Sequence, residues 1–511
     1  MKKNVAKKLK QRKRKIQKRL AKNSFPEKPG PMLNPDPIRY EMGERDRGMI
    51  YGGVGAMQLL VRRLKLDEAI NQKLAIFKLY NPYMESDHVL NIAYNILCNG
   101  RTLEDIERLR NDEVYLDALG APRIPDPTTA GDFCRRFSVE QVEILQDIIN
   151  EVRLKVWAEQ APDFFAEAQI DADGTIAETF GECKDGMDMS YKGVWGYHPL
   201  VVSLANTAEP LFLANRSGNS TSSKDAAGYL DRAIELCRRG GFQRIRLRGD
   251  TDFSQTRYLD GWEDDGVQFV FGMAAMPKLV EMAETLPETA YTPLSRPVKY
   301  TIKTEPRRKP VNVKEEIVQA RGYKNIKLDS EQVAEFDYQP VKCDRSYRVV
   351  VLRKNLSVEK GEAVLFDEVR YFFYLTNDRQ STAAGIVHHA NQRCNQENLI
   401  EQLKNGVSAM RMPVDNLVSN WAYMVMAALA WNLKAWFALS LPASGRWKEK
   451  RRAEKRRVLR MEFKAFRDFF VLLPCRIIQT GRRLIVRLLG WNPHLEIFFR
   501  AVERLSRPLR C

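Results

Sequence analysis

Apolar residues recur every three or four positions between residues 49 and 160. The runs GAMQLLVRRLKLDEAI, SDHVLNIAYNILCNG and TLEDIERLRND all follow this spacing, which is typical of amphipathic helices. Further on, PDPTTAGDFCRRFSVEQVEILQDIINEV indicates a turn, a short helix with Arg135 and Arg136, and a longer helix after Ser138. We therefore predict an all-helical domain over residues 49–160, whose last two helices are either a DNA-reading pair or ordinary helical packing.

The pattern changes to short β-branched and apolar runs near residue 165. AQIDADGT, YHPLVVSLANT and PLFLANRSGN indicate strands, and helical stretches precede two more strands, QRIRLRGD and VQFVFGMAA. This order of elements is typical of a mixed sheet with helices on its faces. Residues 275–365 contain short alternating runs that indicate an antiparallel insertion. We therefore predict an α/β domain over residues 161–440, with a β-rich insertion at about 275–365.

Both ends of the chain are strongly basic. Residues 1–22 hold twelve Lys or Arg and no acid, and residues 445–511 hold nineteen against six acids, within a chain of formal charge +17. We predict a disordered basic tail and a Pro-rich linker over residues 1–48, and a basic helical region over residues 441–511. Two basic ends around an acidic middle favour a polyanionic partner, although a membrane surface attracts the same charges.

Membrane insertion and disulfide chemistry have little support in the sequence. The apolar run 421–441 holds Asn432 and Lys434 near its middle, so we predict a buried core helix and no membrane span. The eight cysteines form no CxxC pair and follow no signal peptide. We therefore expect reduced thiols in a cytoplasmic protein.

Carboxylates fall at the ends of two predicted strands. Asp171 and Asp173 lie on the same side of the strand in IDADGT, because side chains alternate with a period of two. Asp250 ends the strand in RLRGD. Ligands of sheets with parallel strands collect beyond the carboxyl ends of those strands. For any one of these acids an ordinary turn is the more common explanation, and both Asp171 and Asp173 are candidates to face a ligand.

A predicted helix near residue 400 adds a third carboxylate between two cations. Arg393, Glu397 and Lys404 stand at offsets of zero, four and eleven, which brings all three onto one helical face. The pattern is typical of a solvated helix with an Arg393–Glu397 ion pair. Beside the strand-end aspartates it also fits a site for two divalent cations roughly 4 Å apart, which activate an attacking oxygen and stabilise a leaving one. Arg393 or Lys404 would then hold a phosphate.

These residues resemble a known signature. Arg393, Glu397 and Lys404 match R-x3-E-x6-K, which marks a large branch of the DDE transposases of bacterial insertion sequences. Asp173 followed by Gly-Thr resembles the first aspartate of that family, and Asp250 within RGDT resembles the second. The Gly-Thr pair favours Asp173 over its neighbour as the first acid. The order of the three acids and the β-rich insertion before the third are similar as well.

The resemblance, which extends over residues 50–480, implies an RNase H-like mixed sheet flanked by helices. It implies that Asp173, Asp250 and Glu397 hold two Mg²⁺ ions, or Mn²⁺ in their place, and that the two cations of the signature bind DNA phosphate. The implied enzyme is a DNA transposase that cleaves transposon ends and transfers the 3′-hydroxyl into target DNA. Its implied partners are double-stranded DNA, with terminal inverted repeats and target, and a second copy of the chain, in the cytoplasm at the nucleoid.

One position departs from the signature. Ala390 stands where the family usually has a tyrosine that handles phosphate or flanking DNA. In related enzymes the insertion stabilises a flipped base, and Tyr300, Tyr323 and Trp262 are candidates to stack on such a base here. Two other functions stay open: a DNA-binding derivative without catalysis, and a metal-dependent, structure-specific DNA nuclease on the same core.

Overall fold

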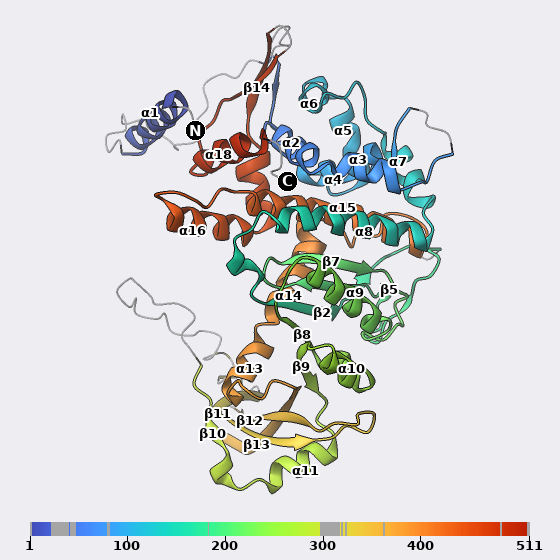
Figure 1. Cartoon of the computed structure of the whole chain (residues 1–511), viewed down its shortest axis with the longest axis vertical. Coiled ribbons are helices and arrows are strands. Elements are labelled where there is room, and N and C mark those ends of the chain that lie inside the picture. Colours follow the sequence, from blue (N-terminus) through green and yellow to red (C-terminus); the bar gives the residue numbers. More distant parts are fainter. Residues whose placement is uncertain are drawn as a thin grey trace.

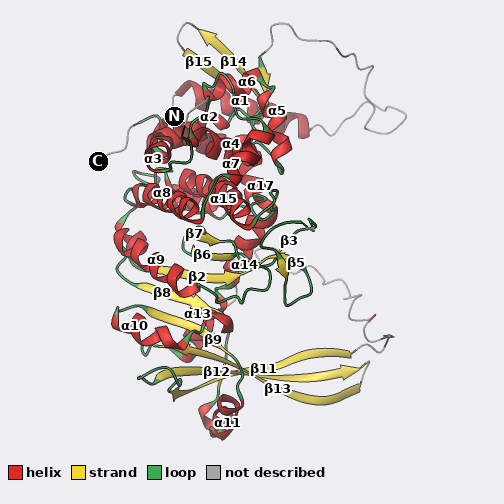
Figure 2. Ribbon diagram, turned by 90° about the vertical axis from the view of Figure 1, so that its right-hand side faces the viewer, coloured by secondary structure: helices red, strands yellow, loops and turns green. Residues whose placement is uncertain are grey.

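The computed structural model has helices toward one end and a long sheet toward the other (Figure 1, Figure 2). It describes residues 3–21, 40, 47–78, 82–181, 183–296, 317, 320–321, 324–360, 363–480 and 483–507. A β-hairpin and the N-terminal helices lie at one end, and the long helices α8 and α15 cross the middle (Figure 1). The sheet follows beyond them (Figure 2).

Helices occupy most of residues 54–157, where apolar residues recur every three or four positions. Several begin at caps encoded in the sequence: Asp112 caps α6, Asp126 with proline after it caps α7, and Ser138 forms a capping box with Gln141 at α8. These helices are α2 (Val54–Leu64), α3 (Leu66–Lys73), α4 (Glu85–Leu97), α5 (Ile106–Arg110), α6 (Glu113–Leu119), α7 (Pro127–Arg135) and α8 (Val139–Trp157).

The last two of these helices are packed into the body of the protein. α8 contacts the core helix α15 (Leu417–Leu439) and the strand β7 (Glu209–Ala214). At the end of α7, Arg135 forms ion pairs with Asp132 at 2.9 Å and with Asp415 at 3.1 Å. A DNA-reading role for this pair stays a prediction.

Nine strands form one mixed sheet in the order β10-β11-β12-β13-β9-β8-β2-β6-β7, so the predicted mixed sheet is confirmed. β2 is parallel to β8, and β8 is parallel to β9, whereas the other neighbours are antiparallel. Helices α9 and α10 lie on one side and α13 and α14 on the other (Figure 1, Figure 2). The bounds are β2 (Ala168–Gly174), β6 (Leu200–Leu204), β8 (Ile245–Gly249), β9 (Gln268–Met273), β10 (Thr292–Pro293), β11 (Lys324–Tyr338), β12 (Tyr347–Lys360), β13 (Ala363–Thr376), α9 (Ala226–Arg239), α10 (Leu259–Asp264), α13 (Ala383–Asn391) and α14 (Cys394–Glu401). A second sheet of three short strands contains β3 (Ala177–Glu178), β4 (Asp188–Met189) and β5 (Trp195–Tyr197).

The predicted insertion continues the main sheet. After the helix α11 (Pro277–Thr285), its strands β11, β12 and β13 pair in antiparallel order, and β13 pairs with β9. The three long strands project beyond the rest of the molecule (Figure 2). β13 runs to Thr376, which is beyond the predicted boundary of the insertion at residue 365. The C-terminal end of this strand pairs with β9, so it belongs to the main sheet. Tyr300 and Tyr323 lie outside the described residues.

The apolar run near residue 430 forms α15. Among the described helices, it is the one long and apolar enough to cross a membrane, and its most apolar window is entirely buried inside the protein. Lys434 in this helix is 1% exposed, donates a hydrogen bond to the carbonyl of Leu459 at 2.6 Å, and lies over the ring of Trp431.

A buried carboxylate joins α15 to α8 and to the sheet. Oε1 of Glu209, on β7, accepts hydrogen bonds from Arg153 Nε at 3.1 Å and Trp436 Nε1 at 2.9 Å. Oε2 accepts from Trp157 Nε1 at 3.1 Å and from the hydroxyl of Thr207 at 2.6 Å. Arg153 and Glu209 are both fully buried, so each charge depends on these partners.

The N-terminal basic segment differs from its prediction. Residues expected to be disordered form the helix α1 (Lys3–Leu20), which contacts the C-terminal helix α18 (Leu495–Leu505). Leu9 is buried, and Arg12 Nη1 donates hydrogen bonds to carbonyls of the C-terminal region at 3.1 and 2.7 Å. The few apolar residues of α1 are therefore enough to anchor this helix, because the C-terminal region supplies a surface against which it packs. Most of the proline-rich linker lies outside the described residues.

The C-terminal region is only partly helical, contrary to the prediction. It contains α16 (Lys448–Leu459), α17 (Phe463–Phe466) and α18, but residues 475–488 form a hairpin of β14 (Cys475–Thr480) and β15 (Arg483–Leu488). β14 also pairs with β1 (Gly48–Met49). This partner is remote in sequence, and pairing of this kind overrides local helical preference.

Replacing Glu209 with Ala should lower the apparent free energy of unfolding by about 3–5 kcal/mol, because Arg153 would remain buried without its counter-ion. Urea denaturation followed by tryptophan fluorescence measures the change. The control is Glu151→Ala, which removes the exposed ion pair with Lys73 and should cost less than about 1 kcal/mol. Equal losses in the two variants would contradict a central role for the buried pair.

Candidate active site

Two aspartates emerge at the ends of adjacent strands. β2 and β8 run parallel with Asp171 opposite Arg248, so Asp173 and Asp250, two residues further along each strand, lie at the same edge of the sheet. Asp250 caps the short 3-10 helix that follows it. The side chains of Asp173 and Asp250 are 15% and 35% exposed, so both are accessible from solvent.

Glycines stand beside both aspartates for a steric reason. A Cβ at Gly174 would lie 2.8 Å from Nε2 of His198, and one at Gly249 would lie 2.6 Å from Cβ of Phe253. These distances are too short for any side chain, so the close approach of neighbouring segments requires glycine at both positions.

Asp171 is engaged in the core. Its two carboxylate oxygens accept hydrogen bonds from Nε and Nη2 of Arg248 at 2.7 and 2.8 Å, and both side chains are at most 1% exposed. Arg248 Nη1 donates to the backbone carbonyl of His389 on α13 at 3.1 Å. Asp171 and Asp173 share a side of β2, but only Asp173 reaches the open edge with Asp250.

The predicted continuous helix around Glu397 is divided. α13 ends at Asn391, α14 begins at Cys394, and residues 402–406 form a π-helical turn. Gln396, on the buried face of α14, donates to the carbonyl of Val201 on β6 at 3.0 Å and accepts from the hydroxyl of Ser203. This anchor was not recognised in the sequence, where a lone glutamine between polar residues carries no signal.

Arg393 stands at the break and points to the aspartates. Its Nη1 lies 3.2 Å from Oδ2 of Asp173 and 3.8 Å from Oδ2 of Asp250. The predicted ion pair with Glu397 within one helix is therefore replaced by contacts to the strand ends. Arg393 is the N-cap residue of α14.

Glu397 is exposed on the next turn, and within the described part of the chain it takes part in no hydrogen bond or ion pair. The three carboxylates do not converge as expected: no three His, Cys, Asp or Glu side chains of the described residues are close enough to hold a metal ion together. Arg393 contacts both aspartates at this edge.

The electrostatics of the edge fit a cation. Burial raises the pKa of Asp173 from 3.8 to about 6, with further increases from the charges of Asp250 and Glu397, while Arg393 acts in the opposite direction. Burial also raises the pKa of Asp250, and Arg393 again opposes it. Asp173 and Asp250 therefore place two partly buried carboxylates close together. Carboxylates suit Mg²⁺, which binds through a few of them and water.

Lys404 lies apart from the two aspartates. It belongs to the π-helical turn, and its Nζ donates to the backbone carbonyl of Ile176, just after β2, at 2.7 Å. Burial and the nearby charge of Lys192 lower its pKa. Lys404 is thus placed along the loop that leaves the edge of the sheet, and not in contact with the acids.

A cavity of about 400 Å³ opens beside Asp250 and Arg393. Ala390 lines it, and aromatic residues 371–374 of β13 form another wall. Tyr374 and Ala390, the position where a tyrosine was expected, line the same cavity and pack against the same small apolar cluster. Trp262, a predicted stacking residue, is instead 4% exposed with its Nε1 hydrogen-bonded to Asp231, so it cannot stack on a base. In the sequence, the aromatic run RYFFYL is the feature from which this wall of the cavity could have been predicted.

The family model described as "Transposase DDE domain group 1" matches residues 50–509. No curated protein matches the sequence. Among solved structures, a cryo-EM structure of a piggyBac transposase synaptic complex with hairpin DNA is similar, with a TM-score of 0.36 and 9% sequence identity, over 83% of this chain and 82% of that one.

Replacing Asp173 with Asn should stabilise the metal-free protein at neutral pH. Because the pKa of Asp173 in the folded state, about 6, exceeds its ordinary value of 3.8, the folded state binds the extra proton between these values, and stability falls as the pH rises through this window. At pH 7.5 we expect a gain on the order of 2 kcal/mol, which shrinks as the pH falls toward 4.5.

Thermal denaturation in EDTA at several pH values measures this gain. Asp252→Asn, a change to an exposed acid two residues after Asp250, is the control and should alter stability little at any pH. A loss of stability in Asp173→Asn at pH 7.5 would contradict the crowding of charge at this edge.

Proposed function

This chain belongs to the family of transposases with a DDE domain of group 1 and is a DNA transposase, and we propose that it cleaves the ends of a bacterial insertion sequence and transfers the freed 3′-hydroxyls into target DNA. The observation that carries the chemistry is the pair Asp173 and Asp250 on adjacent parallel strand ends, with Arg393 between them and Glu397 on the next helical turn. An RNase H-like core is supported by the five strands β7-β6-β2-β8-β9, of which three run parallel.

Asp173, Asp250 and Glu397 would hold two Mg²⁺ ions, for which Mn²⁺ can substitute. When bound, these ions activate an attacking oxygen and neutralise the leaving one. Arg393, which contacts both aspartates, would lose its partners once their charges are neutralised and would then bind a DNA phosphate. Together with Lys404 it makes the R-x3-E-x6-K signature that supports assignment to this branch of the family.

Lys404 would hold a second phosphate at the loop after β2. Its present partner is a neutral backbone carbonyl, and its half-buried position keeps the ammonium poorly solvated. A phosphate is a stronger acceptor than a carbonyl, so the exchange is favourable.

The aromatic cavity beside Asp250 suits an unpaired base near the cleavage point. Tyr371 is partly exposed and Phe372 is 42% exposed, which leaves ring faces for stacking. Tyr374 lines the same cavity as Ala390, and we propose that it takes the place of the tyrosine that the signature usually supplies.

The proposed partners are duplex DNA, as paired transposon ends and target, and a second copy of the chain on those ends. The basic C-terminal region supports DNA binding, and the protein would act in the cytoplasm at the nucleoid. A catalytically inactive DNA-binding derivative is the second candidate, because Arg393 contacts both aspartates and, among the described residues, the three acids do not meet. A structure-specific nuclease is the third.

Purified protein should nick DNA that carries the inverted repeats flanking the gene, and only with Mg²⁺ or Mn²⁺ present. Asp250→Asn and Glu397→Gln should each slow nicking about 1,000-fold, which corresponds to about 4 kcal/mol of transition-state stabilisation. Glu401→Gln, which changes the exposed acid one helical turn later, is the matched control and should keep the wild-type rate. Gel electrophoresis of labelled DNA measures the rates.

Two outcomes assign the chain to the other candidates. A wild type that binds DNA but never nicks it, unaffected by Glu397→Gln, is an inactive derivative. A wild type that nicks the ends but forms no joined product from pre-cleaved ends and a plasmid target is a nuclease.

A further inference from the structure

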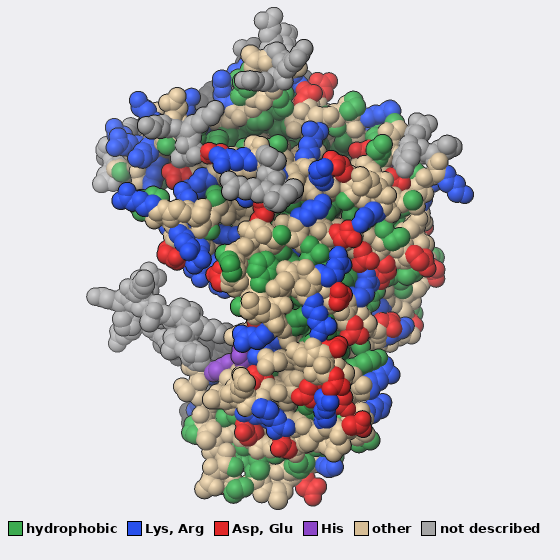
Figure 3. All heavy atoms as spheres, in the orientation of Figure 1, with side chains coloured by type: hydrophobic (Ala, Val, Ile, Leu, Met, Phe, Trp, Pro, Cys, Tyr) green, Lys and Arg blue, Asp and Glu red, His purple; other side chains and the backbone are tan. Residues whose placement is uncertain are grey.

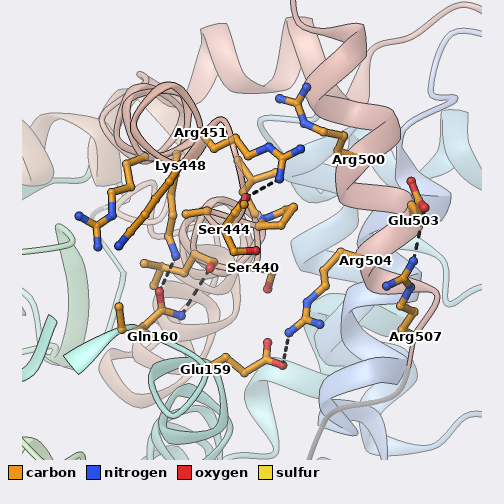
Figure 4. A pocket seen from close by; sticks show the side chains of 18 residues that line it. Glu159, Gln160, Ser440, Ser444, Lys448, Arg451, Arg500, Glu503, Arg504 and Arg507 are labelled. Carbon is orange, nitrogen blue, oxygen red and sulfur yellow. Dashed lines mark hydrogen bonds and ion pairs between the residues drawn. The ribbon is translucent and has the colours of Figure 1, made fainter. Parts of the chain in front are cut away.

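A cleft of about 900 Å³ lies between the end of α8, the loop after α15, and the helices α16 and α18 (Figure 4). Seven Lys or Arg and two Glu line it, an excess of five positive charges. Lys448 and Arg451 come from α16 on one wall, and Arg504 comes from α18 on the other (Figure 4). The residues that line it are different from those of the acid site.

The cations on α18 have acidic partners. Arg504 forms an ion pair with Glu159 at 2.9 Å, and Arg500 forms one with Glu454. These pairs fix the α18 wall against α8 and α16. Glu159 is also paired with Arg63, at 2.5 Å, so Arg504 shares this carboxylate.

Of the four cleft cations on α16, Arg452 pairs with Asp163 at 3.7 Å and with Glu449 at 3.8 Å, and within the described part of the chain the other three lack such partners. Among the described residues, Lys448, Arg451 and Lys455 have no carboxylate oxygen within 4.0 Å. Arg451 donates to the carbonyl of Ser444 at 2.6 Å, and Lys455 donates to Oε1 of Gln160 at 2.6 Å (Figure 4). Both acceptors are neutral, so this wall carries uncompensated positive charge.

One of these cations, Lys455, is also poorly solvated because it is largely buried. Desolvation lowers the pKa of Lys455 to about 8, and the more distant charges of Glu159 and Asp163 offset only part of that effect. An anion in the cleft would stabilise the ammonium form of Lys455. The protein thus holds a cation in a place where it gains from an incoming negative group.

We propose that this cleft binds the phosphate backbone of a duplex DNA segment that lies outside the acid site. Three neighbouring cations without a carboxylate partner in the residues that the structure describes exceed what one small anion needs and suit a row of phosphates. Lys and Arg side chains also gather around α16 and α1 on the face shown in Figure 3. The proposal rests on the proposed function, because a transposase must hold DNA beyond the bond that it cleaves.

The test is the salt dependence of DNA binding by the full chain. Fluorescence anisotropy with a labelled 30-base-pair duplex of mixed sequence is measured at several salt concentrations in EDTA. Lys448→Ala/Arg451→Ala should lower the slope of log K against log salt by about 2, since each phosphate contact contributes about 0.9. The exchange Lys448→Arg/Arg451→Lys should keep the wild-type slope, because it keeps both charges.

The matched control is Arg456→Ala/Arg457→Ala, which removes two exposed cations of the same helix that do not line the cleft. It should leave the slope nearly unchanged, and thermal denaturation should show all variants folded. Equal decreases in both alanine pairs, or no decrease in the first, would overturn the proposal. A wild-type slope in the first pair together with lost binding of inorganic phosphate would assign the cleft to a small anion and overturn it too.

These measurements separate the cleft from the catalytic proposal. Binding in EDTA requires no cleavage, so a wild type that never nicks can still show the loss of slope. Conversely, a protein that nicks DNA normally but shows no loss of slope would retain the proposed reaction and exclude the cleft.

Discussion

The ion pair between Asp171 and Arg248 is enclosed by protein, and three elements depend on it. It joins the parallel strands β2 and β8, and its arginine also binds the end of α13 through the carbonyl of His389. Removing water from two charges is costly, and the pair is maintained because both carboxylate oxygens receive a short hydrogen bond. Asp173 and Asp250 each follow this pair by two residues, so its geometry sets their separation.

The opposite arrangement holds at the open edge. There the aspartates share a single guanidinium, that of Arg393, and burial together with mutual repulsion makes their charged forms unfavourable. The buried Asp171–Arg248 pair thus fixes the position of the strand ends, whereas Asp173 and Asp250, at the open edge, share one positive charge between two carboxylates. The proposed binding of cations and then of phosphate would use this deficit, which comes at a cost in stability of the protein.

The sequence allowed the strand ends and the mixed sheet to be predicted, because period-two alternation and strand–helix order are local signals. Strand alternation alone could not separate Asp171 from Asp173, since both share a side of β2; the Gly-Thr pair favoured Asp173 by resemblance, and in the structure Arg248, across the sheet, engages Asp171. Similarly, the break at Arg393 reflects the anchoring of Gln396 on β6. The C-terminal hairpin depends on β1, more than 400 residues earlier, and no local pattern reports such a partner.

The continuity of the main sheet has a mechanical consequence. β13 is about 45 Å long by the usual rise per residue. One of its ends lies in the projecting arm, and the other is bonded to β9 and lines the cavity beside Asp250. The pairing of β12 with β13 keeps its register from Arg348 to Val358. A ladder of this length resists hinge bending, so the arm behaves as a lever whose fulcrum is the sheet. A force applied at its tip is delivered to the aromatic wall of the cavity, not absorbed in a flexible joint.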